Sequence, residues 1–120
     1  MAKILTVDDA ATIRGPLKLI LEELGHQVFD FENGRVALEF AHQNSVDLVI
    51  TDLNMPEMDG VTLISHLRNL DNYKSIPILV MTTESSDDKK KEAKSVGASG
   101  WLTKPFSRER IKAALNKTIG

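Results

Sequence analysis

Residues 48–56 of this chain read Leu-Val-Ile-Thr-Asp-Leu-Asn-Met-Pro, so that an apolar run leads directly into an aspartate and a loop. The run Leu48–Thr51 carries no charge and is rich in β-branched residues, which is typical of a strand buried on both faces of a parallel sheet. Asp52 follows it at once, and Pro56 closes the loop. This stretch predicts a buried strand whose carboxyl end presents a carboxylate.

Four further segments have strand composition. Three are apolar, and one alternates polar and apolar residues as a half-buried edge strand does. They are Ile4–Val7, Ile76–Met81, Gly100–Thr103 and the alternating segment Gln27–Phe31.

Between these strands, apolar residues recur every three or four positions, which predicts amphipathic helices. The clearest stripe stops at Gly25 and consists of Ile13, Leu17, Ile20, Leu21 and Leu24. Two shorter stripes are Val36, Ala37, Phe40, Ala41 and Leu63, Ile64, Leu67, Leu70. A fourth helix is expected from a cap at Ser85 or Ser86 to Val96, with Gly97 as terminator. A fifth is expected from a cap at Ser107, with Ile111, Ala114, Leu115 and Ile119 facing inward.

Five strands alternating with five helices predict an α/β fold, a doubly wound parallel sheet with helices on both faces. A chain of 120 residues has the length of one ordinary domain, so we expect a single domain over residues 1–120. Pro16 falls inside the first helix and cannot donate to the carbonyl of Thr12, so a bend is expected there.

The composition, 42% hydrophobic and 27% charged, is that of a soluble globular protein. No apolar stretch approaches the roughly eighteen residues of a membrane span, and no signal peptide is recognisable, so we expect a cytoplasmic location and no membrane partner. The absence of cysteine excludes disulfides and thiolate chemistry. A formal net charge of −2 offers no general attraction to nucleic acid.

Open parallel sheets bind ligands beyond the carboxyl ends of their strands. Four predicted strand ends lead into residues with reactive or charged side chains, namely Asp8 with Asp9, Asp52, Thr82 and Lys104. Three carboxylates in one crevice raise one another's pKa or require a counterion. Oxygen ligands without thiolates favour a hard cation, and so few ligands favour Mg²⁺ over Ca²⁺.

The same residue types fit phosphoryl transfer to a carboxylate. Lys104 and Thr82 are suited to the oxygens of a phosphoryl group, and Asp52, at the end of a central strand, is the best candidate nucleophile. Taken singly, the residues have plainer interpretations. Asp8 and Asp9 could cap a helix. Asp52 with Met55-Pro56 and Asp59-Gly60 could form only a turn-rich loop. The conjunction at four strand ends favours the chemical interpretation.

These strand ends resemble the receiver domains of two-component response regulators, and within that family the single-domain chemotaxis type (CheY type). Such receivers carry an acidic pair (Asp8, Asp9), a phosphorylated aspartate (Asp52), a Thr or Ser (Thr82) and a Lys-Pro pair, in this order on these elements. The resemblance covers the whole chain and implies a five-stranded, flavodoxin-like (βα)5 fold with strand order 2-1-3-4-5. It also implies that the Lys104–Pro105 bond is cis.

The resemblance further implies a role for each site residue. Asp9, Asp52 and the backbone carbonyl of Asn54 would bind Mg²⁺ directly, with Asp8 reaching it largely through water. Thr82 and Lys104 would contact the phosphoryl group. Trp101 stands where the family has a Tyr or Phe that switches position together with the threonine. Asn54 and Glu84 match two positions that influence how fast water removes the phosphoryl group, and this pair predicts a short-lived phosphorylated state.

By the same resemblance, the phosphoryl donor is a sensor histidine kinase or a histidine phosphotransfer domain. An output protein is expected to dock on the fourth helix, fifth strand and fifth helix of a monomer that carries no output domain of its own. A phosphate sink and a phosphorelay intermediate remain alternatives. A small phosphatase with an aspartyl nucleophile is less favoured, because such enzymes usually have a second Asp where this chain has Asn54. A nucleotide-binding flavodoxin-like protein is disfavoured because the loop after the first strand is not a phosphate cradle.

Overall fold

The five predicted strands form one parallel sheet in the computed structural model, which describes residues Met1–Gly120. The strands are β1 (Lys3–Val7), β2 (Gln27–Phe31), β3 (Leu48–Thr51), β4 (Ile78–Thr82) and β5 (Gly100–Thr103). Their order is β2-β1-β3-β4-β5, and every neighbouring pair is parallel. The predicted fold class and strand order are confirmed, and β3 with its following Asp52 lies at the centre of the sheet.

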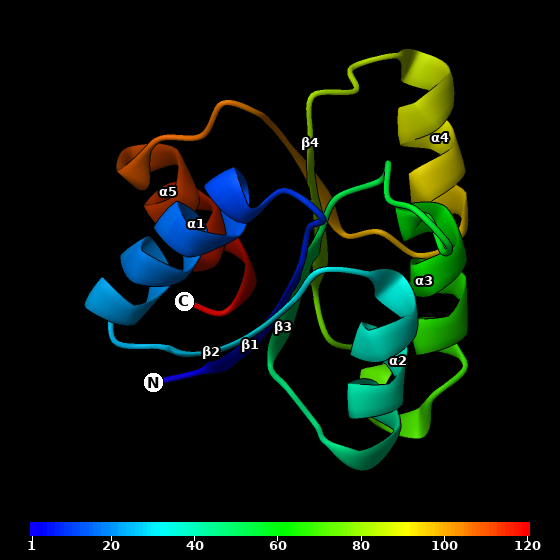
Figure 1. Ribbon diagram of the computed structural model, residues 1–120, viewed down its shortest axis with the longest axis horizontal. Helices are drawn as coiled ribbons and strands as arrows, with labels where there is room; N and C mark the ends of the chain where they lie inside the picture. Colours follow the sequence, from blue (N-terminus) through cyan, green and yellow to red (C-terminus); the bar gives the residue numbers. More distant parts are fainter.

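Helices cover both faces of the sheet (Figure 1). They are α1 (Ala11–Glu23), α2 (Gly34–Gln43), α3 (Gly60–Arg68), α4 (Asp87–Ser95) and α5 (Arg108–Thr118), with a short 3₁₀ turn, η1 (Asp71–Tyr73). α1 and α5 pack on one face, and α2, α3 and α4 pack on the other. Each face has its own apolar core, because the side chains of successive strand residues alternate between them. No helix is long and apolar enough to cross a membrane.

The helix ends follow the predicted capping residues. Ser86 and Ser107 cap α4 and α5, each accepting a hydrogen bond from a backbone N–H three residues later. Gly25 and Gly97 follow the ends of α1 and α4 with φ of 95° and 113°, a conformation that favours glycine. α1 continues through Pro16 without interruption. The preceding Gly15 has no Cβ to crowd the proline ring, which lowers the steric cost of this arrangement.

Three strand boundaries differ from the prediction, since β1 begins one residue earlier, at Lys3, and β4 ends one residue later, at Thr82. The largest difference is the start of β4, which is Ile78 and not Ile76, although residues 76–81 form a continuous apolar run. Pro77 has no N–H to donate to the sheet. The carbonyl of Ile76 instead accepts a hydrogen bond from Arg68 on α3, at 2.7 Å.

Arg68, the last residue of α3, connects the C-terminal ends of α3 and α4 to the segment that precedes β4. Its guanidinium donates to the carbonyls of Tyr73, Ile76 and Gly97 at 2.6 to 3.1 Å. Burial lowers the pKa of Arg68. Nothing in the sequence pattern indicated this role, because the acceptors are backbone carbonyls whose convergence depends on the tertiary fold.

The buried Tyr73 predicts a specific loss of stability in alkali. Its hydroxyl donates to the carbonyl of Asn44 at 2.6 Å, and burial raises the pKa of Tyr73 to about 12. An unfolded chain releases this proton near pH 10, so the contribution is complete below about pH 10. Between about pH 10 and 12 it should decline by roughly 1.4 kcal/mol per pH unit.

The measurement is the free energy of unfolding by denaturant across this pH range, in the wild type and in Tyr73→Phe. Tyr73 is the only tyrosine, so phenolate absorbance reports its ionisation directly. The variant should be less stable at neutral pH because it lacks the hydrogen bond, but its stability should decline less in alkali. Equal alkaline slopes in the two proteins would contradict the prediction.

Candidate functional site

The carboxyl ends of β1 and β3 bring three aspartates together. Val7 and Thr51 are partners in the sheet, so the residues that follow them, Asp8 and Asp52, leave neighbouring strands side by side. Oxygen atoms from Asp8, Asp9 and Asp52 all lie within 4.8 Å of one another. Asp8 and Asp52 are buried, whereas Asp9 is exposed. The cluster therefore has two buried carboxylates and one that faces water.

This donor set fits a magnesium ion. All three side chains supply hard oxygen ligands, and neither histidine nor cysteine is part of the group. Mg²⁺ usually retains several waters and binds through one or two carboxylates. The exposed position of Asp9 leaves room for those waters. Lys104 and a backbone N–H engage the carboxylates of both Asp8 and Asp52, whereas Asp9 makes no hydrogen bond within the chain, so Asp9 is the carboxylate most accessible to the ion.

Lys104 supplies the positive charge inside this crevice. Its Nζ donates to Asp8 Oδ2 at 2.6 Å and to Asp52 Oδ2 at 3.1 Å, and only 9% of its side chain is exposed. Burial acts to lower the pKa of Lys104, but hydrogen bonds and charge attraction from the two carboxylates outweigh it and raise the pKa overall. The lysine thus stays charged and neutralises part of the acidic cluster. The Lys104–Pro105 bond that follows is cis.

The backbone around Asp52 leaves no space for a side chain at position 60. The N–H of Leu53 donates to Asp52 Oδ1 at 2.7 Å, and the N–H of Gly60 donates to the carbonyl of Leu53 at 2.8 Å. A Cβ at Gly60 would overlap the carbonyl oxygen of Asp52. Gly60 is therefore required by close approach, whereas the sequence indicated only a turn. Asp59 is the N-cap of α3, where its side chain accepts from the N–H of Thr62 at 2.8 Å.

The capping interpretation of the first acidic pair is wrong. The N-cap of α1 is Ala10, whose side chain has no acceptor for a backbone N–H of the first turn. Asp8 Oδ1 instead accepts from the N–H of Ala10 at 2.9 Å, within the loop. Arg14 on α1 donates to the backbone carbonyl of Asp8 at 2.8 Å and lies 3.8 Å from Asp30. No sequence signal identified Arg14, which fixes the loop that carries the acidic pair.

The side chains of Thr82 and Trp101 make no hydrogen bond to the acidic cluster. Thr82 is buried at the end of β4, and its Oγ1 accepts from the N–H of Glu84 at 3.2 Å. The backbone N–H of Lys104 donates to the Thr82 carbonyl at 2.8 Å, which links the ends of β4 and β5. Trp101 is half-buried on β5. The side chain of Asn54 is exposed and makes no hydrogen bond within the chain.

Comparison with known proteins identifies the family to which this chain belongs. The model of the response regulator receiver domain matches residues 4–116. The chemotaxis protein CheY of Pseudomonas aeruginosa is 35% identical over 116 residues, which cover 96% of this chain and 94% of that protein. This chain belongs to the receiver-domain family of two-component response regulators.

Solved structures of receiver-type proteins superpose closely on this chain. The chemotaxis protein CheY4 of Vibrio cholerae superposes with a TM-score of 0.95 at 42% identity, covering 98% of both chains. The receiver domain of a sensor histidine kinase from Pseudomonas aeruginosa superposes with a TM-score of 0.92 at 25% identity, covering 99% of this chain and 98% of that one. That domain was solved with a magnesium ion coordinated in its active-site cleft.

Removal of the buried amine should destabilise the protein in a way that Mg²⁺ reverses. Lys104→Met leaves two buried carboxylates without a counter-charge, and loss of one partner of a buried ion pair typically costs about 3–5 kcal/mol. Binding of Mg²⁺ to the folded state then adds stability. The gain should be larger in the variant than in the wild type, because the cation replaces the missing charge.

The measurement is the free energy of unfolding with and without Mg²⁺. Lys18→Met is the matched control, since Lys18 pairs with Asp30 at 3.4 Å with 40% of its side chain exposed. It should lose no more than about 1 kcal/mol and show the wild-type response to Mg²⁺. Equal losses in the two variants would show that Lys104 does not neutralise the cluster.

Proposed function

We propose that this receiver is a chemotaxis regulator of the CheY type that is phosphorylated on Asp52 in a Mg²⁺-dependent reaction. The donor is a phosphohistidine of a sensor kinase or of a histidine phosphotransfer domain. One observation supports this most strongly. The Asp52 carboxylate lies at the end of the central strand, between two further carboxylates and the ammonium group of Lys104. The similarity to the chemotaxis proteins CheY and CheY4 along nearly the whole chain supports the chemotaxis role.

The groups in the crevice divide the work of phosphoryl transfer. One carboxylate oxygen of Asp52 attacks phosphorus in line, forming the O–P bond while the N–P bond of the phosphohistidine breaks. Mg²⁺ held by Asp9 and Asp52 would screen the charge on the phosphoryl oxygens. An ammonium group has three donors, and Lys104 uses two of them on Asp8 and Asp52. The third donor of Lys104 is available for a phosphoryl oxygen. The hydroxyl of Thr82, at the carboxyl end of β4, is proposed to donate to another phosphoryl oxygen.

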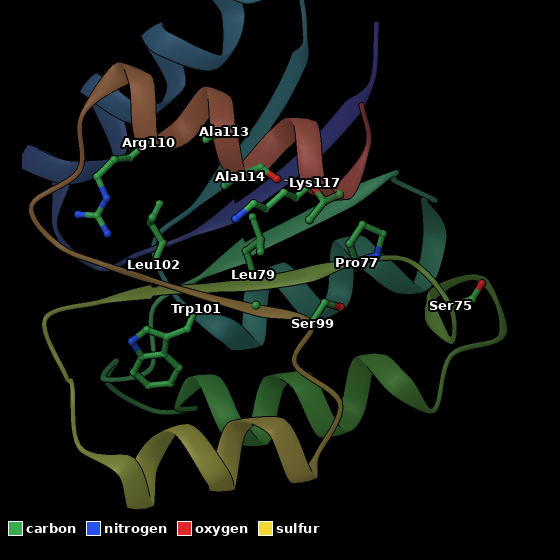
Figure 2. Close-up of a pocket in the computed structure, with 12 residues that line it drawn as sticks. Ser75, Pro77, Leu79, Ser99, Trp101, Leu102, Arg110, Ala113, Ala114 and Lys117 are labelled. Carbon is green, nitrogen blue, oxygen red and sulfur yellow. Dashed lines mark hydrogen bonds between the residues drawn. The ribbon is translucent and has the colours of Figure 1, made fainter.

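The output partner is proposed to dock on the face formed by α4, β5 and α5. A groove of about 680 Å³ lies between β5 and α5, with Arg110 and Lys117 at its rim (Figure 2). A smaller hollow on the other side of β5 is bordered by Lys90 and Lys94. Neither is lined by an acidic residue. This charge fits a partner that offers acidic side chains around an apolar anchor.

Phosphorylation of Asp52 can be tested with the phosphoryl mimic beryllium fluoride and with acetyl phosphate. Emission of Trp101, the only tryptophan, should change when the mimic and Mg²⁺ are both added to the wild type. Mass spectrometry should locate the phosphoryl group on Asp52 after acetyl phosphate treatment. Both signals should be lost in Asp52→Asn, because the amide cannot act as the nucleophile.

The control is Asp71→Asn, which removes a carboxylate that is 97% exposed and far from the crevice in the fold. It should respond like the wild type. Modification of another residue in place of Asp52 would reject the proposed acceptor. Efficient return of the phosphoryl group to a phosphotransfer domain would favour a relay over a chemotaxis output.

We also propose that the receiver assists its own dephosphorylation and is not a phosphatase acting on other substrates. Asn54 and Glu84 follow the ends of β3 and β4, where they flank the proposed phosphoryl position. Replacing both by methionine removes polar groups that can orient an attacking water. Loss of the phosphoryl group should then slow by about tenfold, which corresponds to about 1.4 kcal/mol of activation free energy.

The measurement is the decay of phosphorylated protein after removal of acetyl phosphate. Asn72→Met, an exposed substitution on η1, is the control and should decay at the wild-type rate. An unchanged decay rate in the Asn54 and Glu84 double variant would reject the proposed role of these two residues.

A further inference from the structure

The indole N–H of Trp101 has no hydrogen-bond acceptor in this structure. Figure 2 shows the indole pointing away from the α5 groove, toward α4. The ring packs against the core formed with α2, α3 and α4, yet its Nε1 is buried without a hydrogen-bond partner. A buried N–H that lacks an acceptor opposes burial of the ring. This cost offsets part of what the apolar packing contributes, so a further contact to the ring matters for its position.

Lys90 on α4 supplies that interaction. Its Nζ lies 5.7 Å from the centroid of the Trp101 ring, within the roughly 6 Å range of cation–π attraction, which is strongest for tryptophan. The neighbouring Lys89 pairs with Glu92 at 3.7 Å, whereas Lys90 has no ion-pair partner. A hollow of about 230 Å³ borders the same ring, between α4 and β5. The ring thus has both a contact that holds it and space into which it can move.

A chain of hydrogen bonds joins Thr82 to the turn of α4 that carries Lys90. Thr82 Oγ1 accepts from the N–H of Glu84 at 3.2 Å, and Glu84 Oε1 accepts from the N–H of Ser86 at 3.2 Å. Ser86 is the N-cap of α4, and its carbonyl accepts from the N–H of Lys90 at 3.1 Å. The placement of Lys90 therefore depends on where the hydroxyl of Thr82 is held.

We propose that Lys90 is a positioning residue that holds Trp101 in the ring position of the unphosphorylated state. This inference rests on the proposed phosphorylation of Asp52. When the Thr82 side chain moves to donate its hydroxyl to a phosphoryl oxygen, its Oγ1 leaves the Glu84 N–H, which relaxes the start of α4. Lys90 then leaves the ring. Because its contact exists in the resting state alone, Lys90 opposes the response to phosphorylation.

Three variants of the full chain test this role. Lys90→Met removes the charge and keeps an aliphatic side chain, and Lys90→Arg keeps a cation over the ring. Lys94→Met is the matched control, because Lys94 borders the same hollow from the same helix without lying over the ring. The two readouts are the indole N–H resonance of Trp101 and the affinity for beryllium fluoride in the presence of Mg²⁺.

In Lys90→Met the indole resonance of the unliganded protein should move. The mimic should bind about two- to fivefold more tightly, the range that corresponds to one cation–π contact at an exposed site. The resonance should also shift less on mimic binding than it does in the wild type, since the contact is already lost. Lys90→Arg and Lys94→Met should stay within about twofold of the wild-type affinity.

An unliganded indole resonance that is the same in Lys90→Met and wild type would overturn the contact itself. Equal mimic affinities in Lys90→Met and Lys94→Met would overturn its influence on the response. If none of the proteins binds the mimic, the proposed phosphorylation of Asp52 is rejected, and so is the proposed effect of Lys90 on the response to it. The unliganded resonance would still decide whether Lys90 positions the ring, so the two failures are distinguishable.

Discussion

The rest of the site depends on one buried ammonium group shared by two carboxylates. Lys104 joins the end of β5 to the ends of β1 and β3 through Asp8 and Asp52, across sequence separations of 96 and 52 residues. Two like charges in a crevice this buried would repel each other and pay a large desolvation cost without that group. The pairing therefore fixes the geometry of a site whose members are distant in sequence.

The parallel sheet makes this pairing possible. Because the strands run in one direction, their carboxyl ends lie on one edge, and the order β2-β1-β3-β4-β5 places the ends of β1, β3, β4 and β5 in sequence along it. The apolar cores on the two faces hold the register that sets Asp8 beside Asp52. Close approach at Gly60 and the Arg14 bond to the Asp8 carbonyl then hold the two loops.

The sequence predicted the features that depend on local residue patterns. Apolar periodicity predicted the strands and helices, and the polar residues that follow each strand predicted which side chains would meet. The strand order itself came from the family resemblance, since no local pattern determines which strands are neighbours. Arg14, Gly60 and Arg68 were missed because their partners are backbone atoms brought near by the fold. The start of β4 was misplaced because apolar character outweighed the missing N–H of Pro77.

The resting structure is held by groups that a phosphoryl group would compete for. Two of the three donors of Lys104 bind carboxylates, and the hydroxyl of Thr82 accepts from the loop that leads to α4. A ligand shifts a conformational equilibrium only to the extent that it interacts differently with the two states. Here that difference arises at Thr82, whose Oγ1 gives up the Glu84 N–H, and at Lys104, whose third donor gains a partner. The hydrogen bond from the Lys104 N–H to the Thr82 carbonyl joins the ends of β4 and β5 at which these changes take place, so they are coupled through the backbone as well as through the phosphoryl group.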